Sequence, residues 1–240
     1  MEQTRSKLAG SSAIGAALAR GEALRLIVFD GDREDAAALA LEEPARAAGI
    51  PIQIVGERHF DRLRPPGGPG GAVALLGPAP ASGPAEVLAR PGAAWLLHGI
   101  AYAGNAGMAI RTAEVSGAAG VFIDAEFDHG QRREAVRASM RADRFVPVQW
   151  VGAATVLSAA RGAGRRIISL EDTGTAAPWE VDLTGPALFV VGGEHAGVPD
   201  ELLAQSDQVV RIPMEGFIRS YNLQAAVAII AAERMRQERQ

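Results

Sequence analysis

LFVVGGEHAGVPDELL (188–203) and VVRIPMEGFIRSYNLQAAVAIIAAERM (209–235) are the two stretches that decide the fold of this chain. Each begins with a short β-type run, passes into a polar loop that contains glycine, and continues into a helical pattern. Gly192, Gly193, Gly197 and Gly216 permit close approach of backbone where larger residues would clash. Loops at the carboxyl ends of strands are where open α/β sheets usually bind ligands. The two stretches therefore predict a cofactor site built mostly from backbone.

Strand and helix patterns alternate along the rest of the chain. In the second half we expect strands at 94–100, 120–124, 146–151, 166–172, 187–191 and 209–213, with helices at 108–117, 131–144, 153–164, 198–206 and 222–236. In the first half we expect strands at 24–30, 50–55 and 70–77, with helices at 10–21 and 33–48, the second broken or kinked by Pro44. This alternation predicts an α/β fold with a mainly parallel sheet covered on both faces.

A segment rich in proline, glycine and alanine, residues 78–94, is the best candidate for a linker. A boundary near residue 85 would divide the chain into a small α/β domain, 1–85, and a larger domain, 86–240.

The composition excludes several classes of site. The chain of 240 residues has no cysteine, which excludes disulfides, a thiolate nucleophile and cysteine-ligated metal. Its four histidines are scattered without ligand spacing, so we predict no metal site. The net charge of −4 gives no global positive field for nucleic acid. Lys7 is the only lysine; arginine suits bidentate phosphate contacts, although genomic base composition would explain the bias equally well. No apolar run is long enough to span a membrane, and the N-terminus lacks a signal-peptide pattern, so we expect a soluble cytoplasmic protein.

Several polar residues stand where a ligand could bind, and each has a purely structural alternative. The loop 104–107 precedes a helix and suits an anion, yet Asn105 could simply be a turn residue. Arg111 could be a solvated or salt-bridged helix residue. Ser220 and Asn222 could simply cap the last helix. Neither G-x-G-x-x-G nor a phosphate loop occurs, so a dehydrogenase-like nucleotide site is not supported.

Three motifs in one order are more specific than any of these residues alone. HGIAYAGNAGMAIRTAEVSGAAGVFI (98–123) resembles the first signature of the SPOUT methyltransferases, in the branch that methylates ribose 2′-hydroxyls of tRNA and rRNA. LFVVGGEHAGVPDELL resembles the second signature, and RIPMEGFIRSYNLQAAVAIIAAE (211–233) the third. AVRASMRADRFVPV (135–148) is similar to the segment between them. The resemblance covers residues 94–236. The first eighty residues are similar, more loosely, to a ribosomal-protein-like RNA-binding domain.

The resemblance implies a trefoil-knotted catalytic domain that binds S-adenosylmethionine, acts on RNA and forms a homodimer. It implies that the methyl donor is lined by Gly192, Gly193, Ile212, Met214 and Leu223. It also implies catalytic residues: Asn105 and Arg111 match the family's substrate-side asparagine and arginine, and Glu194, Ser220 and Asn222 match its other motif polar residues. Arg111 is proposed in this family to take the proton; because arginine side chains stay protonated, we expect it to orient ribose and phosphate, with the base role as an alternative.

The chain departs from the family pattern at a few positions. The family's Asp-Pro-Gly-Asn loop is here Tyr102-Ala103-Gly104-Asn105, His98 stands where an acid is frequent, and Arg141 stands where glycine is usual. The leading hypothesis is an S-adenosylmethionine-dependent RNA 2′-O-ribose methyltransferase. The alternative is a non-catalytic RNA-binding or ribosome-assembly protein that keeps the fold.

Overall fold

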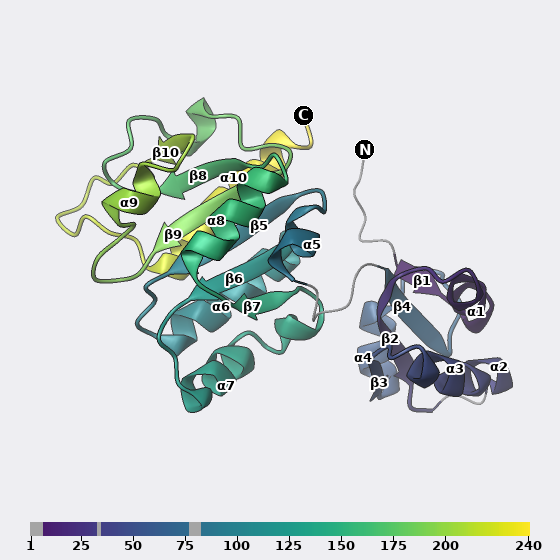
Figure 1. Ribbon diagram of the computed structural model, residues 1–240. Helices are drawn as coiled ribbons and strands as arrows, with labels where there is room; N and C mark the ends of the chain where they lie inside the picture. Colours follow the sequence, from purple (N-terminus) through teal and green to yellow (C-terminus); the bar gives the residue numbers. More distant parts are fainter. Residues whose placement is uncertain (1–6, 33–34, 77–82) are drawn as a thin grey trace. The chain divides into compact units, whose positions relative to one another are not determined.

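The computed structural model describes residues 7–32, 35–76 and 83–240, and the chain divides into two compact units, residues 1–81 and residues 82–240 (Figure 1). The predicted strands and helices are present in both units, with the differences given below. Each unit has its own sheet and its own core.

The first unit is a four-stranded mixed sheet with helices packed on it. Its strand order is β1-β4-β2-β3, with β2 parallel to β3 and antiparallel to β4. The elements are β1 (Lys7–Ala9), α1 (Ser11–Ala19), β2 (Leu24–Asp30), α2 (Ala36–Ala40), α3 (Glu42–Ala47), β3 (Ile52–Val55), α4 (Glu57–Leu63) and β4 (Ala72–Leu76). The three-residue strand β1 has no counterpart in the sequence prediction, because it is too short to show a period.

Pro44 breaks the predicted helix 33–48 three residues before the proline itself. The described part of this segment is two helices, α2 and α3, which meet at Leu41. A proline ring clashes with the carbonyl four residues earlier and supplies no amide hydrogen for it. The affected carbonyl is that of Ala40, so the helix breaks before Pro44, which itself lies in the first turn of α3.

The second unit is a six-stranded sheet in which every pairing is parallel, with the order β10-β8-β9-β5-β6-β7. Its strands are β5 (Ala93–His98), β6 (Gly120–Asp124), β7 (Val148–Trp150), β8 (Arg166–Leu170), β9 (Ala187–Gly192) and β10 (Gln208–Val210). Its helices are α5 (Pro84–Leu88), α6 (Ala103–Val115), α7 (His129–Ala138), α8 (Ala153–Gly162), α9 (Asp200–Leu203) and α10 (Leu223–Gln237), with short 3₁₀ helices at Ala142–Arg144 and Pro178–Glu180. The predicted α/β class with a mainly parallel sheet is confirmed. The trefoil knot that the resemblance implies stays a prediction.

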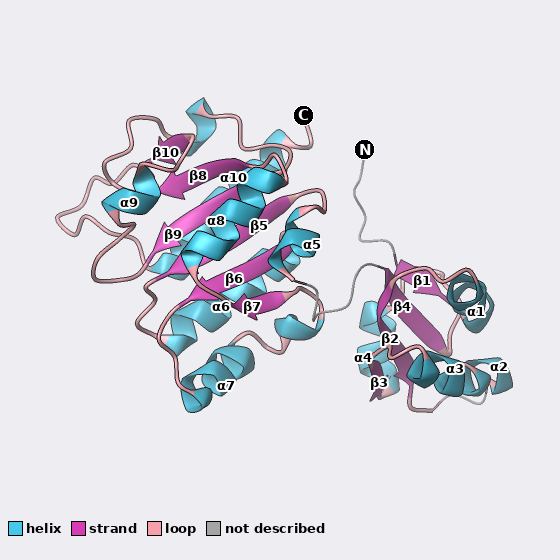
Figure 2. Cartoon of the chain, in the orientation of Figure 1, coloured by secondary structure: helices cyan, strands magenta, loops and turns pink. Residues whose placement is uncertain are grey.

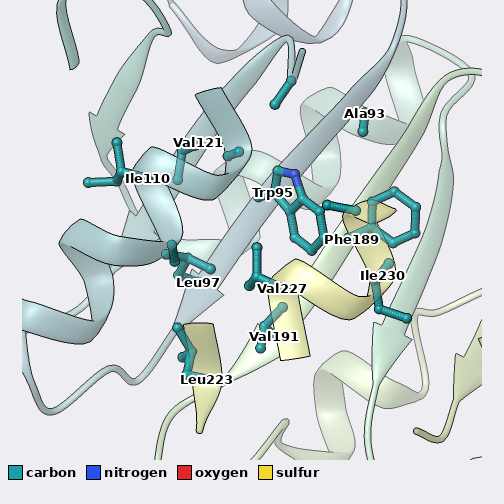
Figure 3. Close-up of a cluster of buried hydrophobic side chains, with 14 of the residues drawn as sticks. Ala93, Trp95, Leu97, Ile110, Val121, Phe189, Val191, Leu223, Val227 and Ile230 are labelled. Atoms are coloured by element: carbon teal, nitrogen blue, oxygen red, sulfur yellow. The ribbon is translucent and has the colours of Figure 1, made fainter. Parts of the chain in front are cut away.

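Helices cover both faces of this sheet, as the alternation predicted (Figure 2). On one face, α6 and α10 pack over Trp95, Leu97 and Phe189, whose side chains point toward Val227 and Ile230 of α10 (Figure 3). The rings of Trp95 and Phe189 stack with centroids 4.9 Å apart. On the other face, α5, α8 and α9 bury the alternate residues of the same strands, among them Leu96, Phe122 and Leu188. Burial on both faces explains why these strands read as continuous apolar runs.

The predicted linker 78–94 is only in part a linker. Residues 77–82 lie outside the described residues, but α5 follows directly and buries Val87 and Leu88 against α8. Residues 82–85, which the sequence assigned to the first domain, therefore belong with the second unit. Pro84 stands at the first position of α5, where proline is favoured because no amide donor is needed there.

Arg165 holds this segment to the sheet. Its buried guanidinium donates to the carbonyl oxygens of Leu88 and Gly92, both at 2.6 Å, and to those of Ala187 and Arg90. Burial, together with the nearby charge of Arg234, lowers the pKa of Arg165 to about 10, which leaves it charged at neutral pH. The sequence offered no sign of this role.

Candidate active site

The loops that follow β8, β9 and β10 enclose a pocket of about 450 Å³ at the carboxyl edge of the sheet. It is lined by residues 170–172, 191–197, 210–212, 214, 219–223 and 226. All five residues predicted to line the donor site are among them: Gly192, Gly193, Ile212, Met214 and Leu223. The structure therefore brings the second and third signatures together around one cavity.

Glycine is required where these loops meet because backbone lies against backbone. A β-carbon on Gly192 would overlap the backbone of Gly197, and one on Gly193 would overlap the carbonyl group of Gly99. Gly197 has a φ of 64° and packs on the Glu171 carboxylate, so a side chain there would be strained as well as crowded. At Gly192 and Gly193 the pocket wall is therefore main chain packed on main chain.

A directed chain of hydrogen bonds borders the pocket. The backbone N–H of Gln224 donates to Asn222 Oδ1 (3.0 Å), and Asn222 Nδ2 donates to Asn105 Oδ1 (3.1 Å). Asn105 Nδ2 then donates to Glu194 Oε1 (2.6 Å), and the N–H of Ala101 donates to Glu194 Oε2 (2.9 Å). Three of the predicted catalytic residues, Asn105, Glu194 and Asn222, thus form one polar array, drawn from α6, the loop after β9 and the start of α10.

Asn222 is also the N-cap of α10, as the capping alternative predicted, and it lines the pocket as well. Ser220 lines the same pocket two residues earlier.

The predicted loop 104–107 is wrong, because α6 already begins at Ala103 and includes these residues. Asn105 is helical rather than a turn residue. Gly107 serves helix packing, since a β-carbon there would overlap Ala135 and Ala138 of α7. The anion expected at this helix start is supplied by the protein itself, as the carboxylate of Glu194 on the N–H of Ala101.

Arg111 lies apart from this array. It is exposed on α6, does not line the pocket, and has no hydrogen-bond or ion-pair partner within residues 7–32, 35–76 and 83–240. Its charge is free to meet a ligand from solvent.

Two residues that line the pocket, Glu171 and Tyr221, were not identified from the sequence, and neither was the partner of His98, which lies outside the pocket lining. Glu171, after β8, accepts hydrogen bonds from the N–H groups of Val198 (2.7 Å) and Asp172 (2.9 Å) and so holds the loop after β9. Tyr221 donates to the carbonyl of Pro213 (3.3 Å) and closes the loop after β10. His98 pairs with Asp124 (3.0 Å), which also accepts from the N–H of Ala153. Of these roles, only that of Glu171 could have been predicted from the sequence, because this residue stands at the end of a predicted strand.

The sequence profile of the SpoU rRNA methylase family matches residues 94–232. The chain belongs to this family. The match begins at the second residue of β5 and ends within α10, so it contains the pocket and the whole hydrogen-bonded chain.

Known relatives agree with this assignment. A 23S rRNA (guanosine-2′-O-)-methyltransferase, RlmB, from Burkholderia sp. is 31% identical over 142 residues, covering 59% of this chain and 58% of that protein. RlmB from Xanthomonas axonopodis is 26% identical over 232 residues, covering 89% of each protein. The chain spans between 44% and 60% of the length of several other curated relatives it matches.

Solved structures share the fold. The S-adenosylmethionine-bound rRNA methyltransferase of Sinorhizobium meliloti aligns with a TM-score of 0.61 at 24% identity, covering 98% of this chain and 88% of that one. The SpoU methyltransferase AviRb of Streptomyces viridochromogenes aligns with a TM-score of 0.60, also at 24% identity, covering 96% and 88%.

Proposed function

We propose that the protein is an S-adenosylmethionine-dependent methyltransferase that modifies a ribose 2′-hydroxyl in rRNA or tRNA. One observation carries this proposal: a backbone-walled pocket opens directly onto the chain of Asn222, Asn105 and Glu194. Both halves of a methyl transfer, donor and acceptor, then have a site at one edge of the sheet. The names of the RlmB relatives support the same reaction.

The pocket suits S-adenosylmethionine in size and chemistry. Its volume of about 450 Å³ lies within the usual range for small-molecule sites, roughly 300–1,000 Å³. Ile212, Met214 and Leu223 provide apolar surface, while the Glu171 and Glu194 carboxylates suit the cationic sulfonium. When bound, S-adenosylmethionine supplies an electrophilic methyl group on that sulfonium.

The residues of the hydrogen-bonded chain orient the attacking hydroxyl. Each Glu194 oxygen accepts one hydrogen bond and retains a second acceptor site, which can receive a ribose hydroxyl. Asn105 and Asn222 hold that carboxylate in place through fixed amide orientations. Positioning of this kind supplies much of the rate of an in-line displacement. Arg111 is exposed and has no partner in the part of the chain that the structure describes, so it is suited to an RNA phosphate.

The test of this division of roles is Arg111→Ala. We expect methyl transfer from tritiated S-adenosylmethionine to total RNA to be abolished, while calorimetry shows nearly unchanged donor affinity, because Arg111 does not line the pocket. Arg133→Ala, an exposed arginine on α7, is the control. Transfer at the wild-type rate by the Arg111 variant would refute its assignment. Absence of donor binding by the wild type at millimolar concentration would refute the enzyme and favour an RNA-binding or assembly protein.

We also propose that the chain forms a homodimer through α10. One face of this helix is buried in the core, yet the opposite face is apolar as well. That second face carries Ala225, Ala228, Ile229, Ala232 and Met235. A helix that is apolar all round is usually covered on both sides. Light scattering should report about twice 25.0 kDa for the wild type, and Ile229→Asp should shift the mass toward that of a monomer.

The first unit is proposed to bind RNA and select the substrate, as its loose resemblance to a ribosomal-protein-like domain implies. Arg58 and Arg62 are exposed on α4 and offer phosphate contacts. Arg58→Ala with Arg62→Ala in the full chain should weaken RNA binding and flatten its salt dependence, by up to about 0.9 in the logarithmic slope per lost contact.

No helix of the described residues is long and apolar enough to cross a membrane. We propose a cytoplasmic location, where RNA and methyl donor are both present.

A further inference from the structure

A second hollow, of about 550 Å³, lies at the start of α6 next to the donor pocket. The two cavities share Asn222, and Asn105 lines the hollow as well. The hydrogen-bonded chain therefore borders both cavities, and this hollow lies next to the place where a ribose would bind at that chain. The residues that give the hollow its chemistry are Tyr102, Met108, Gln131 and Glu134.

Tyr102 provides an exposed aromatic face at the rim. Its side chain is 55% exposed although its backbone is held as the N-cap of α6. Its ring meets the ring of His195 edge to face, with centroids 6.0 Å apart and planes at 63°. Proteins that read single-stranded RNA stack unpaired bases on aromatic side chains of this kind. Met108, 42% exposed one turn into the helix, adds apolar surface beside it.

Glu134 provides a free acceptor on the opposite side. It lies on α7, three residues after Gln131, so both side chains are on one face of the helix. The Gln131 oxygen is already engaged with the N–H of Asp128, which leaves its amide nitrogen free to donate. Within the described part of the chain Glu134 has no hydrogen-bond or ion-pair partner, although α7 carries three arginines.

The shape of this acceptor selects among the four bases. An ionised carboxylate presents two adjacent oxygens and no donor. Guanine has two adjacent donors on its Watson–Crick edge, N1–H and the N2 amino group, whereas adenine, cytosine and uracil each present a single donor group there. Only guanine can therefore pair with Glu134 through two parallel hydrogen bonds.

We propose that this hollow binds the base of the target nucleotide and selects guanine, with Tyr102 stacking on the ring and Glu134 accepting from N1–H and N2–H. This assignment rests on the proposed methyl transfer to RNA. It assigns substrate choice to residues in and beside the first signature, one of which, Tyr102, is a departure from the family's loop.

The first test identifies the methylated nucleotide. Unmodified rRNA and tRNA transcripts are incubated with the wild-type protein and S-adenosylmethionine, and 2′-O-methylation is mapped by resistance to alkaline cleavage. We expect the modified residue to be guanosine. Methylation of adenosine, cytidine or uridine would overturn the guanine assignment while supporting the proposed function. Absence of transfer to every RNA, with absence of donor binding, would refute the proposed function and this assignment with it.

The second test removes one hydrogen bond at a time. Inosine at the mapped position lacks only the N2 amino group, and a bidentate base contact is worth roughly 5- to 150-fold in discrimination. We expect kcat/KM of the wild type to fall by a factor in this range with inosine. We expect Glu134→Gln to lower kcat/KM for guanosine by a similar factor and to distinguish guanosine from inosine by less than about twofold, because its amide opposes the base donors.

Matched variants separate base recognition from other effects. Glu126→Gln makes the same charge change at an exposed residue outside the hollow, and we expect it to keep the wild-type preference. Tyr102→Ala should raise KM for RNA more than it lowers kcat, and Tyr102→Phe, which restores the aromatic face, should return KM toward the wild-type value. Donor affinity, measured by calorimetry, should be unchanged in all four variants. Retention of the full inosine penalty by Glu134→Gln would overturn the role of this carboxylate.

Discussion

Replacing Glu194 by glutamine should break the hydrogen-bonded chain that crosses the site, because that chain has a fixed direction. At one end, the backbone N–H of Gln224 can only donate; at the other, the Glu194 carboxylate can only accept. These two ends set the orientation of the amides of Asn222 and Asn105 between them. A glutamine at 194 brings one oxygen and one NH₂ group to two donors, Asn105 Nδ2 and the N–H of Ala101.

Amide rotation cannot repair the mismatch. If Asn105 rotates to accept from the new amide, its own NH₂ group faces the NH₂ group of Asn222. If Asn222 rotates in turn, it loses the capping bond from Gln224. One donor therefore loses its protein partner; because the Asn222 end of the chain is exposed and water can reach it, the free energy of unfolding should fall by about 1 kcal/mol, the lower end of the range for an unpaired donor. If the same misalignment persists when substrate is bound, methyl transfer should fall by about fivefold, since about 1.4 kcal/mol corresponds to a factor of ten.

In the full chain, the change in stability of the second unit can be measured separately from that of the first. All three tryptophans, Trp95, Trp150 and Trp179, lie in residues 82–240, so urea unfolding followed by tryptophan fluorescence reports on that unit. Glu201→Gln is the control, because Glu201 is exposed on α9 and its carboxylate has no partner in the described residues. A Glu194→Gln protein with the stability and the transfer rate of the wild type would refute the directional argument.

Three further predictions use the same unfolding assay. Gly193→Ala should lower the free energy of unfolding by about 1–3 kcal/mol and weaken donor binding, because its β-carbon would overlap the Gly99 carbonyl. Gly216→Ala is the control and should do neither, because a β-carbon there lies in open space. Equal behaviour of the two variants would contradict the close backbone packing at Gly193. Arg141→Gly should raise the free energy of unfolding of the second unit by about 1 kcal/mol, because Arg141 has a left-handed φ of 62°. Arg137→Gly within α7 should lower it by a similar amount. A change in the same direction for both variants would exclude backbone strain as the cause. Hydrogen bonds from Arg236 and Gln237 lower the pKa of Glu233 from 4.5 to about 2. Because the folded value lies below the unfolded one, the contribution of Glu233 to stability should be complete above pH 4.5 and lost as the pH falls toward 2, and Glu233→Gln should flatten stability over that range.

The strands of the second unit could be predicted almost completely, because burial on both faces leaves each one as a short apolar run between polar loops. The beginnings of helices were less accessible. Gly104 and Gly107 suggested a loop before α6, yet Gly107 is helical and is required by the close approach of α7. A glycine that permits a turn and a glycine that permits helix packing look the same in one sequence. Likewise α5 is short and bounded by proline and glycine, so its burial against α8 left no periodic signal.

The residues of the site could likewise be predicted only in part from the sequence. The contact between Asn105 and Glu194 joins residues 89 positions apart, and only the resemblance to a family could place them together before the structure was known. Arg165 was missed because four backbone carbonyls, rather than acidic side chains, satisfy its charge.

The pocket proposed for the methyl donor is walled partly by main chain, whereas the hollow proposed for the RNA base is lined by exposed side chains. This difference decides which positions of the sequence can vary. Around the donor pocket, Gly192 and Gly193 bring main chain against main chain, so almost any side chain would collide, and the sequence there is constrained to glycine. At the α6 hollow, Tyr102 and Glu134 are exposed side chains whose replacement disturbs no buried contact. At the proposed base site, substitution can therefore alter nucleotide preference without altering the glycine wall of the pocket proposed for the methyl donor. The departure of this chain from the family at Tyr102 falls on the side where such a change costs the fold little.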